Sequence, residues 1–157
     1  MISYLILGFS LSTVSNPCPT ASPSITLNST VVMAKTYEAE SLVNTFISTT
    51  IESCLVCSNE LKVSRIGFKN ELIFQQIVSH YSGPVVIIFY YTTDRMRSAE
   101  IIVNGMLPAT KVIFPPMSTN QDIASLPVTL NLCIGWNSIR IYNTNDYTPD
   151  FDRIIVY

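Results

Sequence analysis

Acidic residues two positions apart occur at two places in the sequence, and this spacing could create a metal site. Glu38 and Glu40 lie in the segment YEAE, and Asp150 and Asp152 lie in PDFD. If these segments are strands, each pair projects from one face, because side chains alternate across a strand. Clustered carboxylates repel one another unless a cation or protons intervene, and calcium takes six to eight oxygen ligands. The alternative is a solvated, charged edge strand that discourages edge-to-edge pairing.

The paired carboxylates could instead be the general acid and base of a glycosidase, but that reaction needs a cleft that holds a sugar between them. Nothing in the sequence predicts such a cleft. A Ser-His-Asp or Cys-His arrangement would have to use His80, the only histidine, which lies in the turn-like segment SHYSGP. We therefore expect no catalysis within these 157 residues.

The four cysteines are Cys18, Cys54, Cys57 and Cys133. Their even number and the lack of a zinc partner set favour disulfides over a metal site. Cys54 and Cys57 form a C-x-x-C motif, but no second such pair completes a zinc ribbon. A thioredoxin-like dithiol would need a helix after the motif, and none is predicted there.

The elements that must position these residues are short strands. Seven runs with strand-like apolar content, separated by turn residues, cover 71–78, 84–92, 99–104, 109–114, 126–132, 136–142 and 151–157. No stretch keeps a 3.6-residue apolar period over three turns. The pattern predicts an all-β fold, an antiparallel β-sandwich, over residues 36–157. Within it we expect the aromatic residues from Phe89 to Tyr91, which alternate across a buried strand, and also Trp136 to serve in packing.

The first 35 residues differ from the rest in composition. Residues 1–15 are apolar and of signal-peptide length, although no Lys or Arg precedes them, and residues 16–30 are rich in Pro, Ser and Thr. We interpret residues 1–35 as a leader and linker of a secreted protein, too short and Ser-interrupted for a membrane span. Nine Lys and Arg against eleven Asp and Glu give a formal charge of −2, which argues against a nucleic-acid partner.

Five segments carry a family resemblance in their order and spacing. They are YEAE (37–40), SCLVCSNELKVSRIGF (53–68), FYYTTDRMRSAEIIVNG (89–105), VIFPP (112–116) and the closing LNLCIGWNSIRIYNTNDYTPDFDRIIVY. With them the chain resembles the carbohydrate-binding modules of families 35 and 6, and most of all the family 35 modules appended to secreted α-galactosidases. The resemblance implies a jelly roll of the galactose-binding-domain-like type.

The resemblance also implies a calcium cofactor. In such a jelly roll the first and last strands lie side by side, which would bring some of the four carboxylates together. Family members hold a structural calcium with the E-x-E pair and the Asp before R-I. In this sequence those residues are Glu38, Glu40 and Asp152.

The family's cysteine pair corresponds to Cys54 and Cys57, which we expect to form a short-loop disulfide. Cys18 lies in the leader and Cys133 ends a predicted core strand. We therefore expect these two cysteines to remain separate from each other.

The sugar site is where the sequence departs from the family. The family's aromatic position in G-Y-I-G is Arg65 here, and Asn120 stands about where a second aromatic residue is usual. The residue two before the calcium-binding Asp, which hydrogen-bonds the sugar in related modules, is Asp150. Tyr147, in the polar loop NTNDYTPD, is the ring that could stack on a sugar. We predict weak glycan binding by these four residues.

The sequence thus predicts a secreted, monomeric, non-catalytic carbohydrate-binding module stabilised by calcium. Its partner would be a polysaccharide or oligosaccharide that contains galactose, mannose or uronic acid. Two alternatives stay open. The chain could be a fragment or remnant of a modular α-galactosidase, or a degenerate sandwich that has no sugar site and acts through protein contacts.

Overall fold

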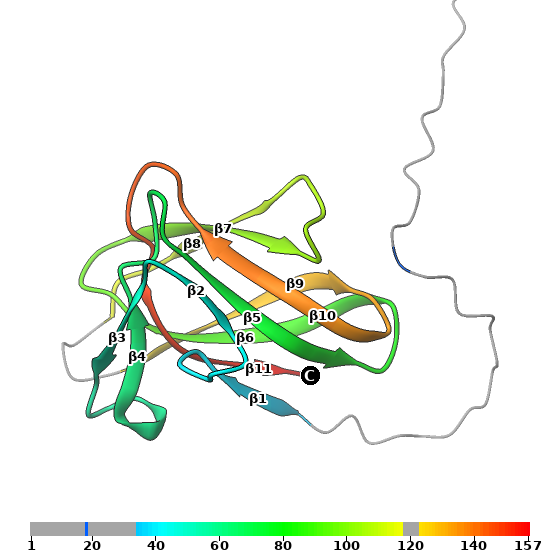
Figure 1. Ribbon diagram of the computed structural model, residues 1–157, viewed down its shortest axis with the longest axis horizontal. Coiled ribbons are helices and arrows are strands. Elements are labelled where there is room, and N and C mark those ends of the chain that lie inside the picture. The colour runs from blue at the N-terminus through cyan, green and yellow to red at the C-terminus, as the bar shows by residue number, and fades with distance from the viewer. Residues whose placement is uncertain (1–17, 19–33, 118–122) are drawn as a thin grey trace, which may run out of the picture.

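The computed structural model describes residues 18, 34–117 and 123–157 of the protein, and in them the chain forms eleven strands and one short 3₁₀ helix (Figure 1). The elements are β1 (Lys35–Glu38), β2 (Thr45–Ile47), β3 (Thr50–Ser53), η1 (Ser58–Glu60), β4 (Leu61–Ser64), β5 (Glu71–Ser79), β6 (Gly83–Thr92), β7 (Arg97–Val103), β8 (Thr110–Phe114), β9 (Ala124–Leu132), β10 (Gly135–Tyr142) and β11 (Asp150–Val156). Over these residues no helix has the length and apolar character needed to cross a membrane.

Two antiparallel sheets pack face to face. One has the order β3-β4-β11-β6-β9, with β1 also paired to β11, and the other has the order β2-β5-β10-β7-β8. Figure 1 shows the two layers and the loops that join them at each end. This arrangement confirms the predicted all-β sandwich.

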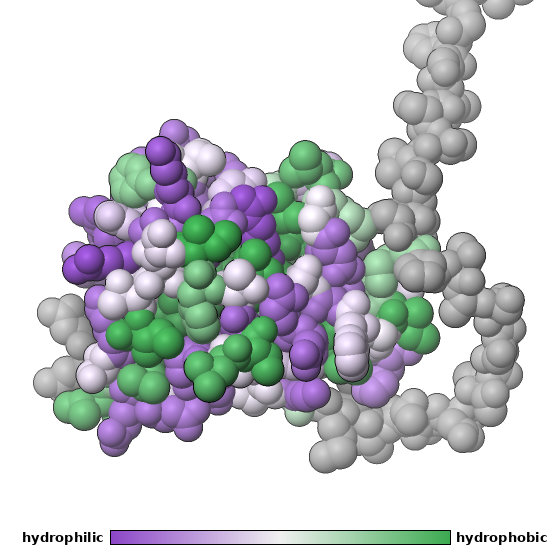
Figure 2. Space-filling view, viewed as in Figure 1, coloured by the Kyte–Doolittle hydropathy of each residue, from purple (hydrophilic) through white to green (hydrophobic). Residues whose placement is uncertain are grey.

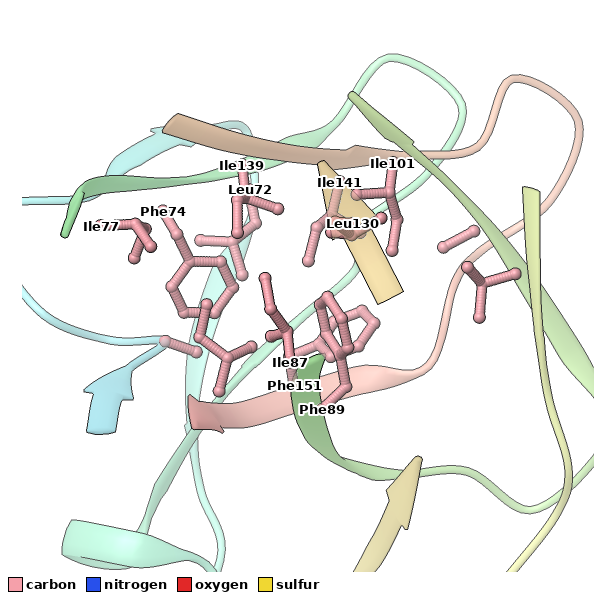
Figure 3. Packing of buried hydrophobic residues seen from close by; sticks show 14 of the residues in the cluster. Leu72, Phe74, Ile77, Ile87, Phe89, Ile101, Leu130, Ile139, Ile141 and Phe151 are labelled. Atoms are coloured by element: carbon pink, nitrogen blue, oxygen red, sulfur yellow. The ribbon is translucent and has the colours of Figure 1, made fainter. Parts of the chain in front are cut away.

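The core lies between the sheets and follows from period-2 alternation. In β6, Phe89 and Tyr91 are buried as predicted. Tyr90, also expected to pack in the core, is only half-buried and lies beneath the guanidinium of Arg153. Phe89, Phe114 and Phe151 meet edge to face, with ring centroids 5.4 to 6.2 Å apart. Figure 3 shows side chains from both sheets pointing toward one another. On the face seen in Figure 2, hydrophobic residues are interspersed with hydrophilic ones.

Trp136 does not belong to this core, so that prediction is wrong. Its side chain is 76% exposed on the outer face of β10. The inward position at this end of the strand is taken by Asn137, whose side chain hydrogen-bonds the backbone N–H and C=O of Cys133, each at 2.8 Å. Alternation along the strand then directs the neighbouring Trp136 to solvent.

The cysteines form two disulfides, one predicted and one not. Cys54 and Cys57 are bonded to each other as predicted, with Cα atoms 5.3 Å apart. Cys18 and Cys133 are also bonded, with Cα atoms 5.2 Å apart, so the expectation that they stay separate is wrong. Cys133 does not lie within a sheet: it follows the last residue of β9, in the turn to β10. At this end of the sandwich, residues from outside the domain can reach it.

Candidate functional site

The three predicted calcium ligands lie in one region because β1 pairs with β11. Glu38, the last residue of β1, is opposite Arg153, next to Asp152. Glu40 lies in the turn that follows β1, and the N–H of Ala39 donates to the Asp152 carbonyl at 2.8 Å. The first and last strands are therefore neighbours, as the resemblance implied.

A bulge in β11 turns Asp152 inward. The register against β6 shifts between Phe151 and Arg153, so two consecutive residues, Phe151 and Asp152, are both fully buried. Strict alternation would place one of them outside. Bulges of this kind redirect a side chain without ending the strand. The sequence pattern did not indicate this bulge.

The short helix η1 connects the three carboxylates. The Ser58 N–H donates to Asp152 Oδ1 at 2.8 Å, and the Ser58 hydroxyl donates to Glu38 Oε2 at 2.7 Å. The Asn59 amide donates to Glu40 Oε1 at 3.0 Å. We call Glu38, Glu40 and Asp152 the acidic cluster. Ser58 and Asn59 of η1 link its members through one backbone and two side-chain hydrogen bonds. In this arrangement the described residues include no group of three or more His, Cys, Asp or Glu that could hold a metal ion.

Two electrostatic features mark the acidic cluster as short of positive charge. The pKa of Asp152 is raised to about 6, mainly by burial and in smaller part by the negative charges of Glu38 and Glu40. The Arg153 guanidinium and the Ser58 N–H act in the opposite direction without cancelling the effect of burial. In addition, Glu40 Oε2 is buried and has no hydrogen-bond partner among the described residues. Such an atom usually has a water, a proton or an ion as partner.

A cavity of about 600 Å³ lies beside the acidic cluster, at the end of the sandwich where β6 ends and β7 and β11 begin. The Cys54–Cys57 loop forms its apolar wall with Leu55 and Val56, and Leu55 is 87% exposed. Further lining residues are Ser53, Cys54, Lys62, Thr92, Thr93, Asp94, Arg97, Met117, Thr148 and Asp150. A concave site with apolar walls and a few fixed polar groups suits a small polar ligand.

Asp150 is one of the charged residues that line this cavity. Its Oδ2 accepts from Lys62 Nζ at 2.8 Å, and the same ammonium donates to Thr92 Oγ1 at 3.2 Å. Burial raises the pKa of Asp150, while the Lys62 ammonium lowers it. Oδ1 has no partner among the described residues. Lys62 therefore positions one oxygen of the carboxylate, and the described residues leave the other as an acceptor for a ligand hydroxyl.

The other predicted sugar ligands are placed differently. Arg65 is exposed, in the left-handed region at φ 58°, and it is not part of the cavity lining. Tyr147 is 39% exposed and also lies outside the lining, one residue from Thr148. Its ring meets Phe68 edge to face, with centroids 4.9 Å apart. Asn120 lies outside the described residues.

Sequence reasoning missed Lys62, Arg97 and the Leu55–Val56 wall. Lys62 stands in the family-like segment SCLVCSNELKVSRIGF, so its role as partner of Asp150 could have been inferred from the resemblance. Arg97 opens β7, and its guanidinium donates to the Tyr147 carbonyl at 3.0 Å. No local pattern indicates that contact, because it joins residues 50 positions apart.

No protein-family model matches the chain, and no curated protein is a match to it in sequence. Solved structures do match. An exo-β-1,3-galactanase from Phanerochaete chrysosporium with galactose is 29% identical, with a TM-score of 0.71, over 80% of this chain and 29% of that chain. A variant of that enzyme with β-1,3-galactotriose is 30% identical, with a TM-score of 0.72, over 81% of this chain and 30% of that chain. The protein thus spans less than a third of the galactanase.

A family 35 carbohydrate-binding module from Clostridium thermocellum matches over nearly its whole length. It is 24% identical, with a TM-score of 0.73, and the alignment covers 78% of this chain and 97% of the module. Neither of these proteins is an α-galactosidase, so that association stays a prediction. The described residues have the fold of family 35 carbohydrate-binding modules.

Proposed function

We propose that the protein is a non-catalytic domain that binds galactose-containing glycans in the cavity beside Asp150. The observation that carries the proposal is an Asp150 carboxylate with one oxygen paired to Lys62, in a cavity that Leu55 and Val56 also line. Sugars offer vicinal hydroxyls to such an acceptor and a C–H face to apolar side chains. Further support comes from the galactose and β-1,3-galactotriose present in the galactanase structures, and from the binding modules of similar length.

The charges of the cavity favour a neutral sugar over a uronic acid. Lys62 is paired with Asp150, and Arg97 lies 3.5 Å from Asp146. The described lining therefore has no cation without a carboxylate neighbour, and a uronate would compete with both pairs. Because none of the described lining residues is aromatic, we expect a dissociation constant of about 1 mM for a monosaccharide, equivalent to about 4 kcal/mol.

Titration calorimetry with galactose and β-1,3-galactotriose tests the proposal. Asp150→Ala should abolish measurable binding, whereas Glu100→Ala, on the other sheet, should bind as the parent does. Thermal melting of both variants establishes that they are folded. A parent that binds neither sugar would overturn the proposed function. Equal binding by the parent and Asp150→Ala would exclude this cavity as the site.

We further propose that the acidic cluster holds a structural calcium ion. The chemistry of the donors fits, because carboxylate oxygens are what calcium prefers, and the buried, unpartnered Glu40 Oε2 can serve as a ligand. Glu38, Glu40 and Asp152 would hold the ion after a rearrangement of their side chains, because in the arrangement of the described residues they form no metal-binding group and accept from Ser58 and Asn59 instead. The charge of the ion would offset their mutual repulsion. Secretion belongs to the same proposal, since the two disulfides need an oxidising compartment.

Melting curves with calcium and with a chelator test the calcium proposal. Calcium at a hundredfold above its dissociation constant should raise the unfolding free energy by about 2.7 kcal/mol. Asp152→Asn should remove this response, whereas Asp150→Asn, outside the acidic cluster, should retain it. A parent whose melting temperature is the same in calcium and in chelator would show that the cluster binds no ion.

A further inference from the structure

Beside the cavity lies an exposed aromatic pair that neither the cavity nor the core uses. Phe68 is 51% exposed, and its ring meets Tyr147 at an interplanar angle of 84°. In an edge-to-face pair, one ring covers at most one face of the other, so flat apolar surface remains open to solvent. Exposed apolar groups set among polar ones often mark ligand-binding grooves.

The backbone holds this pair rigidly. Gly67 bridges to Tyr147, and the Thr148 N–H donates to the Ile66 carbonyl at 2.8 Å. Figure 1 shows the β4–β5 and β10–β11 loops side by side at this end of the sandwich. Phe68 itself has φ 58°, in the left-handed region that a bulky residue rarely adopts. Unfavourable backbone conformations of this kind concentrate at functional sites.

The aromatic pair is continuous with the cavity. Thr148, next to Tyr147, belongs to the cavity lining, and Arg97 both lines the cavity and donates to the Tyr147 carbonyl. Asp146, which precedes Tyr147, lies 3.9 Å from the Arg95 guanidinium, and both side chains are more than half exposed and can bond hydroxyls. An apolar face with charged hydrogen-bonding groups at its border is suited to a sugar ring.

We propose that Phe68 and Tyr147 form a second sugar subsite, which stacks on the next ring of a glycan whose first ring occupies the cavity. The inference rests on the proposed function and adds to it the preferred ligand, an oligosaccharide rather than a monosaccharide. It also assigns the stacking surface to Phe68. In the sequence, Phe68 follows closely after Arg65, which stands at the family's aromatic position.

Titration calorimetry on the full chain with galactose and β-1,3-galactotriose tests the subsite. The parent should bind the trisaccharide at least tenfold more tightly than galactose. Phe68→Asn removes the ring but tolerates a positive φ, and it should reduce this ratio about tenfold, which corresponds to about 1.4 kcal/mol. Phe68→Trp should preserve the ratio. Trp136→Ala, which removes an exposed ring from the other sheet, is the control and should leave it unchanged.

The outcomes separate this inference from the function on which it rests. If the parent binds glycan and Phe68→Asn has the parent's ratio, the subsite is overturned and the cavity proposal stands. The same conclusion follows if Trp136→Ala lowers the ratio while Phe68→Asn does not. If the parent binds neither sugar, both proposals fail. Melting curves confirm that each variant is folded.

Discussion

Asp152 is a carboxylate that the fold buries, although a charged carboxylate is more stable in water. A carboxylate loses hydration when it is buried, which is why the pKa of Asp152 rises to about 6. Its hydrogen bond from Ser58 and the neighbouring Arg153 guanidinium only partly offset that loss. The bulge at this position buries the group together with Phe151 instead of leaving it in solvent. Such a site is stabilised by a proton or by a cation.

This burial predicts how the stability of the metal-free protein depends on pH. An unfolded aspartate titrates near 3.9, so the folded protein holds the Asp152 proton more tightly than the unfolded chain. The stabilisation is complete below about pH 4 and is lost as the pH rises to about 6. The unfolding free energy, measured by urea titration in a chelator, should therefore fall by about 3 kcal/mol across this window, at 1.36 kcal/mol per pKa unit.

Asp152→Asn provides the comparison for this pH dependence, because it retains the shape of the side chain and does not titrate. The difference in unfolding free energy between parent and variant should change between pH 4 and pH 6 and be constant above it. Parallel pH profiles for the two proteins would contradict the raised pKa.

At the scale of elements, the β4–β5 and β10–β11 loops can approach each other only because Gly67 lies between them. A Cβ atom at this position would be 2.2 Å from the Asp146 carbonyl oxygen and 2.7 Å from the Tyr147 Cα atom. Both are backbone atoms, which cannot rotate away as the end of a flexible side chain can. The residue also has φ 135°, where glycine is strongly preferred.

Gly67→Ala should therefore lower the unfolding free energy by about 3 kcal/mol or more, as measured by urea denaturation. Gly105→Ala is a matched control, because Gly105 also has a positive φ, at 72°, but a Cβ atom added there would have no neighbouring atom within 4 Å. Its loss should be about 1 kcal/mol, from backbone conformation alone. Equal losses for the two variants would mean that the close approach of the loops does not matter.

The sequence predicted the long strands but not the short ones, for a physical reason. Seven strands of five to ten residues display a readable apolar pattern. By contrast, β2, β3 and β4 have only three or four residues and take their form from partners distant in the sequence. β4 is one of the elements that shape the cavity, because it contains Lys62.

The site was predictable to the extent that it depends on local spacing or on the family resemblance. The pairing of β1 with β11, which the resemblance implied, was enough to place Glu38, Glu40 and Asp152 in one region. The strand-face argument from the i, i+2 spacing was wrong for Glu40, because β1 ends at Glu38 and Glu40 lies in the following turn. The bulge at Asp152 and the contact of Phe68 with Tyr147 were not predictable, since both depend on register and packing between distant segments. The sequence therefore indicated the carboxylates but not the aromatic pair.

At the scale of the whole molecule, the acidic cluster and the cavity share their supports. Asp150 and Asp152 are two residues apart in β11, one in the cavity lining and the other in the acidic cluster. The Cys54–Cys57 loop contributes Leu55 and Val56 to the cavity, and η1, which begins directly after it, donates to Asp152. Calcium in the acidic cluster would thus also order one wall of the cavity.

The Cys18–Cys133 disulfide acts on the whole molecule, because its partners are 115 residues apart and nearly the entire sandwich lies between them. A cross-link reduces the conformational entropy of the unfolded chain, and the resulting stabilisation grows with the length of the closed loop. For a loop of 100 residues it is about 4.7 kcal/mol. The Cys54–Cys57 loop, with a separation of 3 residues, should contribute about 2 kcal/mol or less.

Replacing Cys18 and Cys133 together by Ser avoids a free thiol and should lower the unfolding free energy by about 4 to 5 kcal/mol. The corresponding Cys54 and Cys57 double variant should lose no more than about 2 kcal/mol. Denaturant titration of the three proteins in parallel measures both losses, and a larger loss for the short loop would contradict this assignment.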